Sequence, residues 1–216
     1  MTQVFQLKNK PHGIDRGKLF LEEGFVCIGW PEIGNLEKAD KEMIRQKLEE
    51  RYHYEGQRLG AYTGVVNMFV NVVKPGDVIL VPDGSIVHVG VSGPYRYAGE
   101  YDHKDIGMCH RRPVEWKATV AKSILDQKVV DLVKNRGTMT KFSGTYEDTG
   151  LESVIDEGAH APFAVIEDTL DVRGGDGLFD SETSDAAKAV LNDALRYDHP
   201  ERRMQAAFSI LKLSKD

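Results

Sequence analysis

The feature that most constrains the fold is a pair of apolar segments, residues 78–81 and 85–91, joined by Pro82-Asp83-Gly84. Both segments are dominated by valine and isoleucine, whose branched side chains favour extended strands. The glycine can adopt the backbone dihedral angles that a tight hairpin turn requires. The stretch therefore predicts two antiparallel strands connected by a turn, so the fold is expected to contain an antiparallel sheet.

Further strands and helices are predicted on both sides of this hairpin. Apolar runs rich in β-forming residues predict strands over residues 2–7, 25–30, 112–120 and 138–142. Helical patterns, with Asp15 as a cap and with Gly24 and Gly137 as stops, predict helices over 14–24, 38–54, 57–73 and 123–137. Strands that surround a few helices are typical of an α+β fold, here a small, partly closed β-barrel with helices packed outside it.

The distribution of charge divides the chain near residue 143. Residues 1–143 carry 21 Lys and Arg against 18 Asp and Glu, a net charge of +3, whereas residues 144–216 carry 7 against 16, a net charge of −9. We therefore predict a barrel domain over residues 1–142 and an acidic, mainly helical extension over residues 143–216. Within the extension, the pattern predicts a strand at 163–168 and helices at 184–197 and 200–213. The mildly basic first part can approach phosphates locally, but the whole protein is not expected to bind nucleic acid tightly without specificity.

Composition also restricts the cellular setting. No run approaches the roughly 18 apolar residues that span a bilayer, and the N-terminal stretch lacks the apolar centre of a signal peptide. Cys27 and Cys109 are the two cysteines, and without CxxC spacing they are expected to be reduced thiols. These features predict a cytoplasmic protein that does not contact a membrane.

Asp83, Glu115 and Lys117 match the D…ExK pattern of Mg²⁺-dependent nucleases of the PD-(D/E)xK type. Such a site needs two carboxylates close to one Mg²⁺ and a lysine that positions water or stabilises charge. Alternation along a strand would put Glu115 and Lys117 on the same face. The pattern carries little information, however, and Asp83 also belongs to the predicted hairpin turn. A nuclease therefore stays as an alternative interpretation.

Other catalytic patterns are missing from the sequence. His88, His103 and His110 lie near Cys109 without the spacing of an HExxH or paired-cysteine metal site. No GxSxG nucleophile motif is present, and the glycines of residues 173–177 lack the strand and helix that flank a phosphate-binding loop. Outside the nuclease alternative, we predict no catalytic residue, no metal and no cofactor.

Aromatic residues interleaved with cations indicate a different chemistry. At predicted strand ends, or in the loop between strands, lie Trp30, Tyr95, Tyr97, Tyr101 and Trp116. Aromatic faces can sandwich an unstacked base, which contributes roughly 1–3 kcal/mol per base. Side chains suited to the flanking phosphates lie among these rings: His103, Lys104, His110, Arg111, Arg112 and Lys117. Each ring could equally fill the core, so the residues by themselves leave the assignment open.

Five segments carry a resemblance to a known family: LEEGFVCIGW, MIRQKL, MFVNVVKPGDVILVPDG, HVGVSGPYRY and HRRPVEW. In this order they resemble the EVE-like modified-base-reading domains of the PUA-like superfamily, which occur at the N-terminus of methylation-dependent restriction proteins. The resemblance covers roughly residues 4–142. It implies a small β-barrel with an aromatic pocket that accepts a modified base flipped out of DNA, in a restriction or phage-defence setting.

The resemblance also implies roles for individual residues. The base pocket is expected to be formed by Trp30, Tyr95, Tyr97 and Trp116, together with His88, which alternates within an apolar strand. The phosphates are expected to be bound by Lys104, His110, Arg111, Arg112 and Lys117. Family members usually join this reader to a cutting or translocating module, whereas residues 143–216 carry neither an NTPase loop nor an HNH-like Cys/His set. The chain therefore looks like a stand-alone reader, or like a reader whose effector is a separate protein. DNA is favoured over RNA as the nucleic acid, and the extension is a candidate surface for contacts with an effector protein or a second copy.

A third interpretation comes from a different class of protein. The barrel of a non-catalytic interaction protein would bind a nucleotide or a protein partner, and its acidic extension would make the contacts. The sequence leaves the nuclease and the interaction protein open beside the base reader, and it does not identify the modified base.

Overall fold

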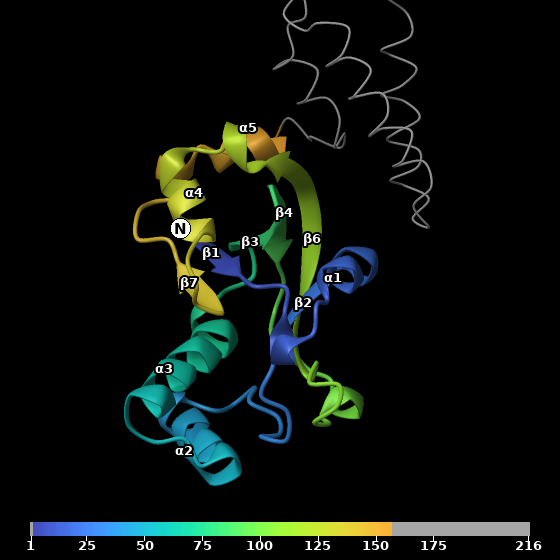
Figure 1. Cartoon of the computed structure of the whole chain (residues 1–216), viewed down its shortest axis with the longest axis vertical. Helices are drawn as coiled ribbons and strands as arrows, with labels where there is room; N and C mark the ends of the chain where they lie inside the picture. The colour runs from blue at the N-terminus through green and yellow to red at the C-terminus, as the bar shows by residue number, and fades with distance from the viewer. Residues whose placement is uncertain (1, 157–216) are drawn as a thin grey trace, which may run out of the picture. The chain divides into compact units, whose positions relative to one another are not determined.

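The computed structural model describes residues 2–156, all within one compact unit of the chain. Its architecture is mixed α+β, and the described strands form one curled seven-stranded sheet, a half-barrel with helices around it (Figure 1). The strand order is β2-β6-β4-β3-β1-β7, with β5 paired beside β6. The strands are β1 (Val4–Leu7), β2 (Phe25–Ile28), β3 (Val78–Asp83), β4 (Ile86–Ser92), β5 (Arg96–Tyr97), β6 (His110–Ala121) and β7 (Met139–Lys141). The α+β class is confirmed, and each strand expected between residues 2 and 142 is present.

The hairpin forms as expected and sets the register of the sheet. β3 ends at Asp83, β4 begins at Ile86, and Gly84 between them takes a positive φ of 52°. Pairing continues from Asp83 opposite Ile86 to Val78 opposite Val91. β1 lies parallel to β3, a pairing that needs a long connection, and the intervening helices supply it.

The sheet buries side chains on both faces, which explains why its central strands read as continuous apolar runs. Because successive residues of a strand point to opposite faces, Ile79 and Val81 enter one core cluster, and Val78 and Leu80 enter the other. The first cluster packs against α1 (Gly17–Glu23), α2 (Lys41–Tyr52) and α3 (Gly56–Asn67), the second against α4 (Gln127–Val133) and α5 (Leu151–Asp156). Figure 1 shows α2 and α3 at one end of the sheet and α4 and α5 at the other.

The helices predicted between residues 14 and 137 are present, but their ends differ from the expectation. α2 begins after Asp40, whose carboxylate accepts a hydrogen bond from the Met43 amide at 2.8 Å and so caps the helix. The single helix expected over 57–73 is divided, because α3 ends at Asn67 and residues 68–72 continue as a wider π-helical turn. The chain leaves this turn in an extended conformation at Val73.

Arg112 is 2% exposed and lies against the end of this turn. Its guanidinium donates to the carbonyls of Phe69 at 2.7 Å, Val70 at 3.0 Å, Val73 at 2.7 Å and Gly93 at 2.7 Å. Burial lowers the pKa of Arg112 to about 10, which leaves the side chain charged at neutral pH. The guanidinium therefore satisfies carbonyls that a helix end leaves without partners, and its burial removes it from the expected phosphate contacts.

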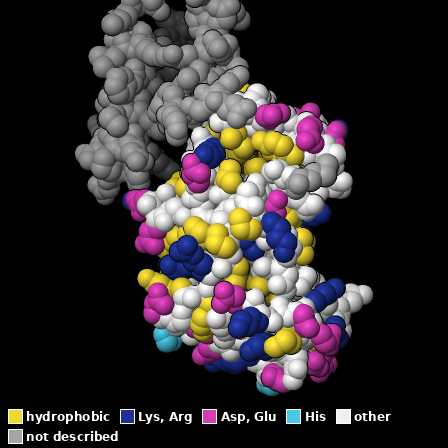
Figure 2. Space-filling view, turned by 180° about the vertical axis from the view of Figure 1, so that it is seen from behind, with side chains coloured by type: hydrophobic (Ala, Val, Ile, Leu, Met, Phe, Trp, Pro, Cys, Tyr) yellow, Lys and Arg dark blue, Asp and Glu magenta, His cyan; other side chains and the backbone are white. Residues whose placement is uncertain are grey.

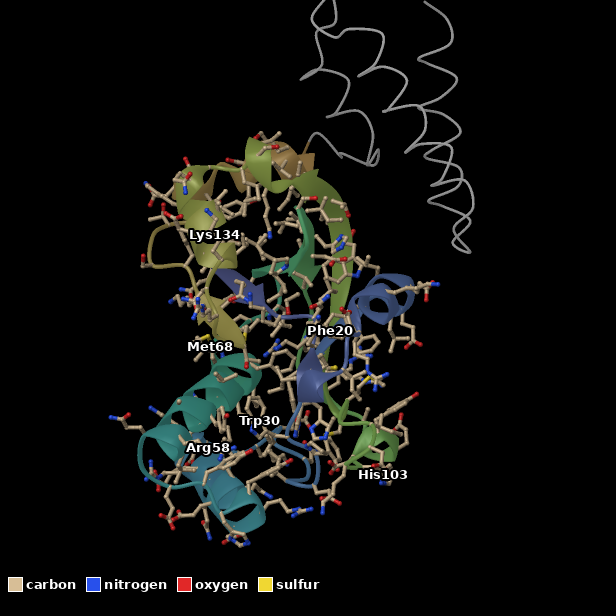
Figure 3. All side chains as sticks on the ribbon, in the orientation of Figure 1. Phe20, Trp30, Arg58, Met68, His103 and Lys134 are labelled. Carbon is tan, nitrogen blue, oxygen red and sulfur yellow. The ribbon has the colours of Figure 1, made fainter. Side chains whose placement is uncertain are left out.

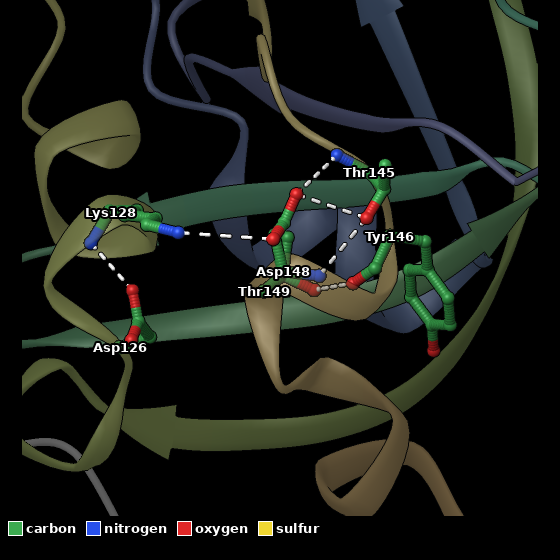
Figure 4. Close-up of polar contacts among 6 residues, drawn as sticks. All are labelled: Asp126, Lys128, Thr145, Tyr146, Asp148 and Thr149. Carbon is green, nitrogen blue, oxygen red and sulfur yellow. Dashed lines mark hydrogen bonds and ion pairs between the residues drawn. The ribbon is translucent and has the colours of Figure 1, made fainter.

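Residues 143–156 pack onto this unit, although the sequence placed them in the acidic extension. The Asp148 carboxylate accepts hydrogen bonds from the Thr145 amide and hydroxyl at 2.9 and 3.0 Å, and lies 3.9 Å from the Lys128 ammonium of α4 (Figure 4). Leu151 is fully buried in the second core cluster. The packed unit therefore continues past the boundary expected at residue 142. The strand expected at 163–168 and the helices expected at 184–197 and 200–213 lie outside the described residues.

The cysteines and the helix lengths agree with the sequence. Cys27 and Cys109 are both buried and carry free thiols. Between residues 2 and 156, no helix combines the length and the apolar character that crossing a membrane requires.

Candidate functional site

A recess of about 270 Å³ lies at the seam of the half-barrel, between residues next to the two end strands of the sheet. Gly29 and Trp30, which follow β2, line one side, and Thr138, which precedes β7, lines another. The loop after β1 and the region of α2 and α3 supply the remaining lining: Lys10, Pro11, His12, Gly13, Tyr52, Tyr54 and Tyr62. The volume is slightly below the roughly 300–1,000 Å³ typical of small-molecule pockets.

Four aromatic rings form a continuous cluster along this recess. The ring centroids of Trp30 and Tyr62 are 5.3 Å apart, those of Tyr62 and Tyr54 are 4.9 Å apart, and those of Tyr54 and Tyr52 are 5.1 Å apart. Tyr52 and Tyr54 are nearly parallel, at 13°, whereas Tyr62 meets Trp30 at 57° and Tyr54 at 62°. All four rings are half-buried. Partly exposed aromatic faces of this kind can stack against a planar heterocycle.

Basic side chains lie beside the aromatic rings of the recess. The Arg58 guanidinium lies 4.5 Å from the Tyr54 ring centroid and 5.5 Å from that of Tyr62. Figure 3 shows Arg58 and Trp30 at the same end of the described unit. Lys10 and His12 belong to the lining itself, and no carboxylate does among the described residues. Lys10 also lies 3.6 Å from the Asp15 carboxylate, which is outside the lining. The recess therefore offers a planar ring aromatic faces with basic side chains beside them.

Two glycines let the loop that carries His12 approach closely. A Cβ atom at Gly29 would lie 3.1 Å from the His12 amide nitrogen, and a Cβ atom at Gly107 would lie 3.1 Å from the His12 Cβ atom. His12 itself has a positive φ of 55°. A side chain at Gly29 or Gly107 would therefore require His12 to shift.

A larger hollow of about 610 Å³ lies elsewhere, beside Lys74 and Lys141. Its lining contains no aromatic ring, and its acidic residue, Asp77, is already bonded to the backbone amides of Gln3 at 2.9 Å and Lys74 at 2.7 Å. The smaller aromatic recess is therefore the better candidate, since it combines stacking surfaces with cations.

Of the expected pocket residues, the structure brings only Trp30 into the recess. The Tyr95 hydroxyl lies 2.8 Å from Nδ1 of His110, and the Tyr97 hydroxyl donates to the Asp102 carboxylate at 2.5 Å. Burial raises the pKa of both tyrosines. Their hydroxyls are thus used in internal hydrogen bonds, and neither ring is part of the recess lining.

Trp116 and His88 lie together on one face of the sheet, outside the recess lining. The Trp116 indole donates from Nε1 to the Phe20 carbonyl at 2.8 Å, and His88 Nδ1 lies 2.8 Å from the Thr119 hydroxyl. The two rings meet edge to face, with centroids 6.3 Å apart. Burial lowers the pKa of His88, with the nearby Asp83 charge acting in the opposite direction. Both residues therefore pack the sheet rather than form the expected pocket.

The expected phosphate-binding residues are dispersed. His110 is fully buried. The Arg111 guanidinium lies between the rings of Phe25 and Tyr101, 4.4 and 3.8 Å from their centroids, and its Nε donates to the Met108 carbonyl at 2.7 Å. Because neighbouring residues of a strand alternate, Arg111 points to the opposite face of the sheet from His110. Neither Arg111 nor His110 is among the residues that line the recess.

The two expected lysines also lie apart from the recess lining. Lys104 is exposed in the loop before β6, and Figure 3 shows the neighbouring His103 on the far side of Trp30 from Arg58. Lys117 pairs with Glu115, and it is the extra residue of a bulge, since Trp116 and Ala118 are the successive partners of β4. Lys104 thus stays a candidate for a peripheral phosphate contact.

The nuclease residues are not assembled. Asp83 pairs with Ile86 at the hairpin turn, and Ile86 lies opposite Ala121, whereas Glu115 lies opposite Val91. Along β4, five positions separate Ile86 from Val91, so Glu115 lies roughly 16 Å along the strands from the hairpin end, at about 3.3 Å per residue. One Mg²⁺ cannot bind carboxylates that far apart. Within residues 2–156, no group of three or more His, Cys, Asp or Glu side chains is arranged to hold a metal.

Sequence reasoning missed most of the residues that form the recess. Tyr52, Tyr54 and Tyr62 come from the α2–α3 region, and Lys10 and His12 come from the loop after β1. The one local signal was the density of tyrosines at the junction of α2 and α3, with Arg58 among them. Their approach to Trp30 depends on how the two helices pack on the sheet, which no local pattern records.

The fold and the recess together define an α+β half-barrel domain with an aromatic recess at its seam. Its family follows from a sequence comparison: a model described as "Domain of unknown function (DUF8426)" matches residues 8–142, and the chain belongs to this family. The matched range contains every residue that lines the recess. No curated protein and no solved structure matches the chain significantly.

Proposed function

We propose that this domain reads a modified base in DNA, which it accepts as a flipped-out nucleotide in the aromatic recess. The observation that carries the proposal is the cluster of Trp30, Tyr54 and Tyr62 around an open recess with Arg58 stacked beside it. Nucleic-acid-binding sites that take one base out of the stack use this combination of aromatic faces and cations. The curled sheet is also compatible with a PUA-like barrel of the EVE type.

Net binding would require both the aromatic faces and the basic side chains of the site. Unpairing and extruding a base costs a few kcal/mol, and stacking returns roughly 1–3 kcal/mol per base. Stacking alone therefore gives little net affinity. Lys10, His12 and Arg58 would contribute the remainder through the phosphates next to the flipped nucleotide.

The surface charge favours local rather than extended phosphate contact. Figure 2 shows that Lys and Arg side chains on the face seen there are interspersed with acidic and apolar ones and do not form one basic patch. Such a surface gives weak non-specific attraction to DNA. Selectivity for one base in the recess would then decide where the protein binds, as a restriction or phage-defence reader in the cytoplasm requires.

The test is a binding panel. Fluorescently labelled duplexes that carry one methylated or hydroxymethylated cytosine, or one methylated adenine, would be titrated with the protein beside the unmodified duplex. We expect at least one modified duplex to bind several-fold more tightly. Trp30→Ala and Tyr62→Ala should weaken that binding about 10-fold or more, since each removes a stacking face.

Two controls separate stacking and charge from loss of structure. Trp30→Phe keeps a ring and should retain most of the affinity, whereas Arg58→Ala should lose affinity and Lys134→Ala should not. Lys134 is exposed just after α4, at the opposite end of the unit from Arg58 (Figure 3). If Trp30→Ala and Tyr62→Ala bind every duplex as the wild type does, the recess is not the reading site.

A further inference from the structure

Four consecutive residues beside the recess, Trp30–Ile33, are held by four side chains from three other places in the fold: α2, the start of β6 and the loop at Asp102. His110 Nε2 lies 3.2 Å from the Trp30 carbonyl, and the Tyr52 hydroxyl donates to the Pro31 carbonyl at 2.7 Å. Asp102 accepts a hydrogen bond from the Glu32 amide, and Lys47 donates to the Ile33 carbonyl at 3.0 Å. Each residue of this segment therefore has a backbone atom that is hydrogen-bonded to a side chain from elsewhere in the fold.

The backbone of the segment needs this support. Trp30 and Glu32 have φ values of 66° and 64°, in the left-handed region that residues other than glycine rarely adopt. Such conformations cost of order 1–3 kcal/mol each and persist when the surrounding structure imposes them. The conformation of Trp30 sets where its indole lies in the recess.

The hydrogen bonds that reach Trp30 have a fixed direction. A carbonyl can only accept, so the His110 ring must carry its proton on Nε2 and donate it to the Trp30 carbonyl. Neutral His110 then presents a lone pair on Nδ1, which accepts the Tyr95 hydroxyl proton across 2.8 Å. His110 is fully buried, and burial lowers its pKa to about 4, so the ring is neutral at physiological pH.

We infer that Tyr95 and His110 are positioning residues, which fix Trp30 before any ligand arrives, so that the recess is already formed in the free protein. Asp102 supports the same segment at Glu32 and is itself bonded to the Tyr97 hydroxyl at 2.5 Å. A preformed wall reduces the conformational freedom that binding would otherwise remove. The effect on ligand affinity rests on the proposed function, whereas the effect on the free protein does not.

The first experiment therefore uses the free protein. The chain has two tryptophans, so a ¹⁵N-labelled sample gives two indole N–H signals in an NMR correlation spectrum, and Trp30→Phe assigns them. We expect Tyr95→Phe to shift or broaden the Trp30 signal. The Trp116 signal should stay in place, because its Nε1 is bonded to the Phe20 carbonyl.

A pair of substitutions at His110 separates positioning from packing. Glutamine can donate to the Trp30 carbonyl and accept from Tyr95, whereas leucine fills the apolar space and can do neither. His110→Gln should keep a Trp30 signal close to that of the wild type, and His110→Leu should not. If the Trp30 signal is unchanged in Tyr95→Phe and in folded His110→Leu, or if leucine preserves it better than glutamine, the positioning role is wrong.

The second experiment measures the affinity of the same variants for the modified duplex that the wild type prefers. One net hydrogen bond contributes about 0.5–1.5 kcal/mol, so Tyr95→Phe should weaken binding about 2- to 10-fold while His110→Gln stays near the wild type. If no duplex binds even the wild type, the proposed function fails, and the indole spectra still decide the positioning role. If duplexes bind and the variants disturb Trp30 without changing affinity, the recess is preformed but binding does not depend on it.

Discussion

Arg112 is a formal charge in the interior whose partners are backbone carbonyls rather than a carboxylate. Removing it leaves these carbonyls buried without donors, which is more costly than the loss of one surface ion pair. We expect Arg112→Met to lower the free energy of unfolding by about 3–5 kcal/mol, measured by urea denaturation. Arg112→Lys keeps the charge but offers fewer donors. Its free energy of unfolding should therefore lie between those of the wild type and Arg112→Met. A loss below about 1 kcal/mol for Arg112→Met would contradict this account.

His110 gives stability a predictable dependence on pH. Its folded pKa of about 4 lies below the usual 6.5, because burial and the Lys47 charge lower it more than the Trp30 carbonyl and Asp102 raise it. Between these two values the unfolded chain binds more protons, so stability is complete above pH 6.5 and decreases towards pH 4. We expect a loss of up to about 3 kcal/mol over this range, and burial of His88 acts in the same direction.

Chemical denaturation of the wild type and His110→Gln at several pH values measures this effect. Glutamine does not titrate, so the variant should depend less steeply on pH between 4 and 6.5. Parallel curves for the two proteins would show that His110 does not contribute.

Among the elements, the pairing of β4 with β6 requires glycine, which has no side chain, at position 90. A Cβ atom at Gly90 would meet Val114 and would lie 2.8 Å from the Trp116 ring and 3.2 Å from the Glu115 carbonyl. We expect Gly90→Ala to destabilise the fold by about 1–3 kcal/mol through overpacking. Gly60→Ala on α3 is the matched control, since nothing lies within 4 Å of that position and alanine favours a helix. Thermal melts should therefore move in opposite directions for the two variants.

The strands and the recess also show which features could be predicted from the sequence and which could not. The hairpin and the strand positions were predictable because apolar runs and a glycine turn are local signals. Tyr95 and Tyr97 both lie against the His110 ring, with centroids 6.1 and 6.0 Å away. Their hydroxyls are used in internal hydrogen bonds, and neither ring lines the recess. The recess joins Trp30 to Thr138 across the seam, and contacts between such distant positions have no local pattern.

For the whole molecule, the extent of the folded unit has a direct test. Leu151 is fully buried in the second core cluster, and burying a leucine side chain stabilises a fold by about 1.5–3 kcal/mol. A chain that ends at Phe142 should therefore unfold at a lower temperature than one that ends at Asp156. Leu151→Ala in the full chain should reproduce most of that difference. Equal melting temperatures for the two shortened chains would place the edge of the stable unit at residue 142.

The position of the recess at the seam has a consequence for how ligand selectivity can change. One wall follows β2 and another precedes β7, and these are the first and last strands of the sheet order. The gap between them is therefore set by the curvature accumulated over all the strands in between, including the irregular β4–β6 pairing. A substitution that tightens or relaxes that curvature could resize the opening from a distance, so that relatives with identical rings around the recess could still prefer different ligands.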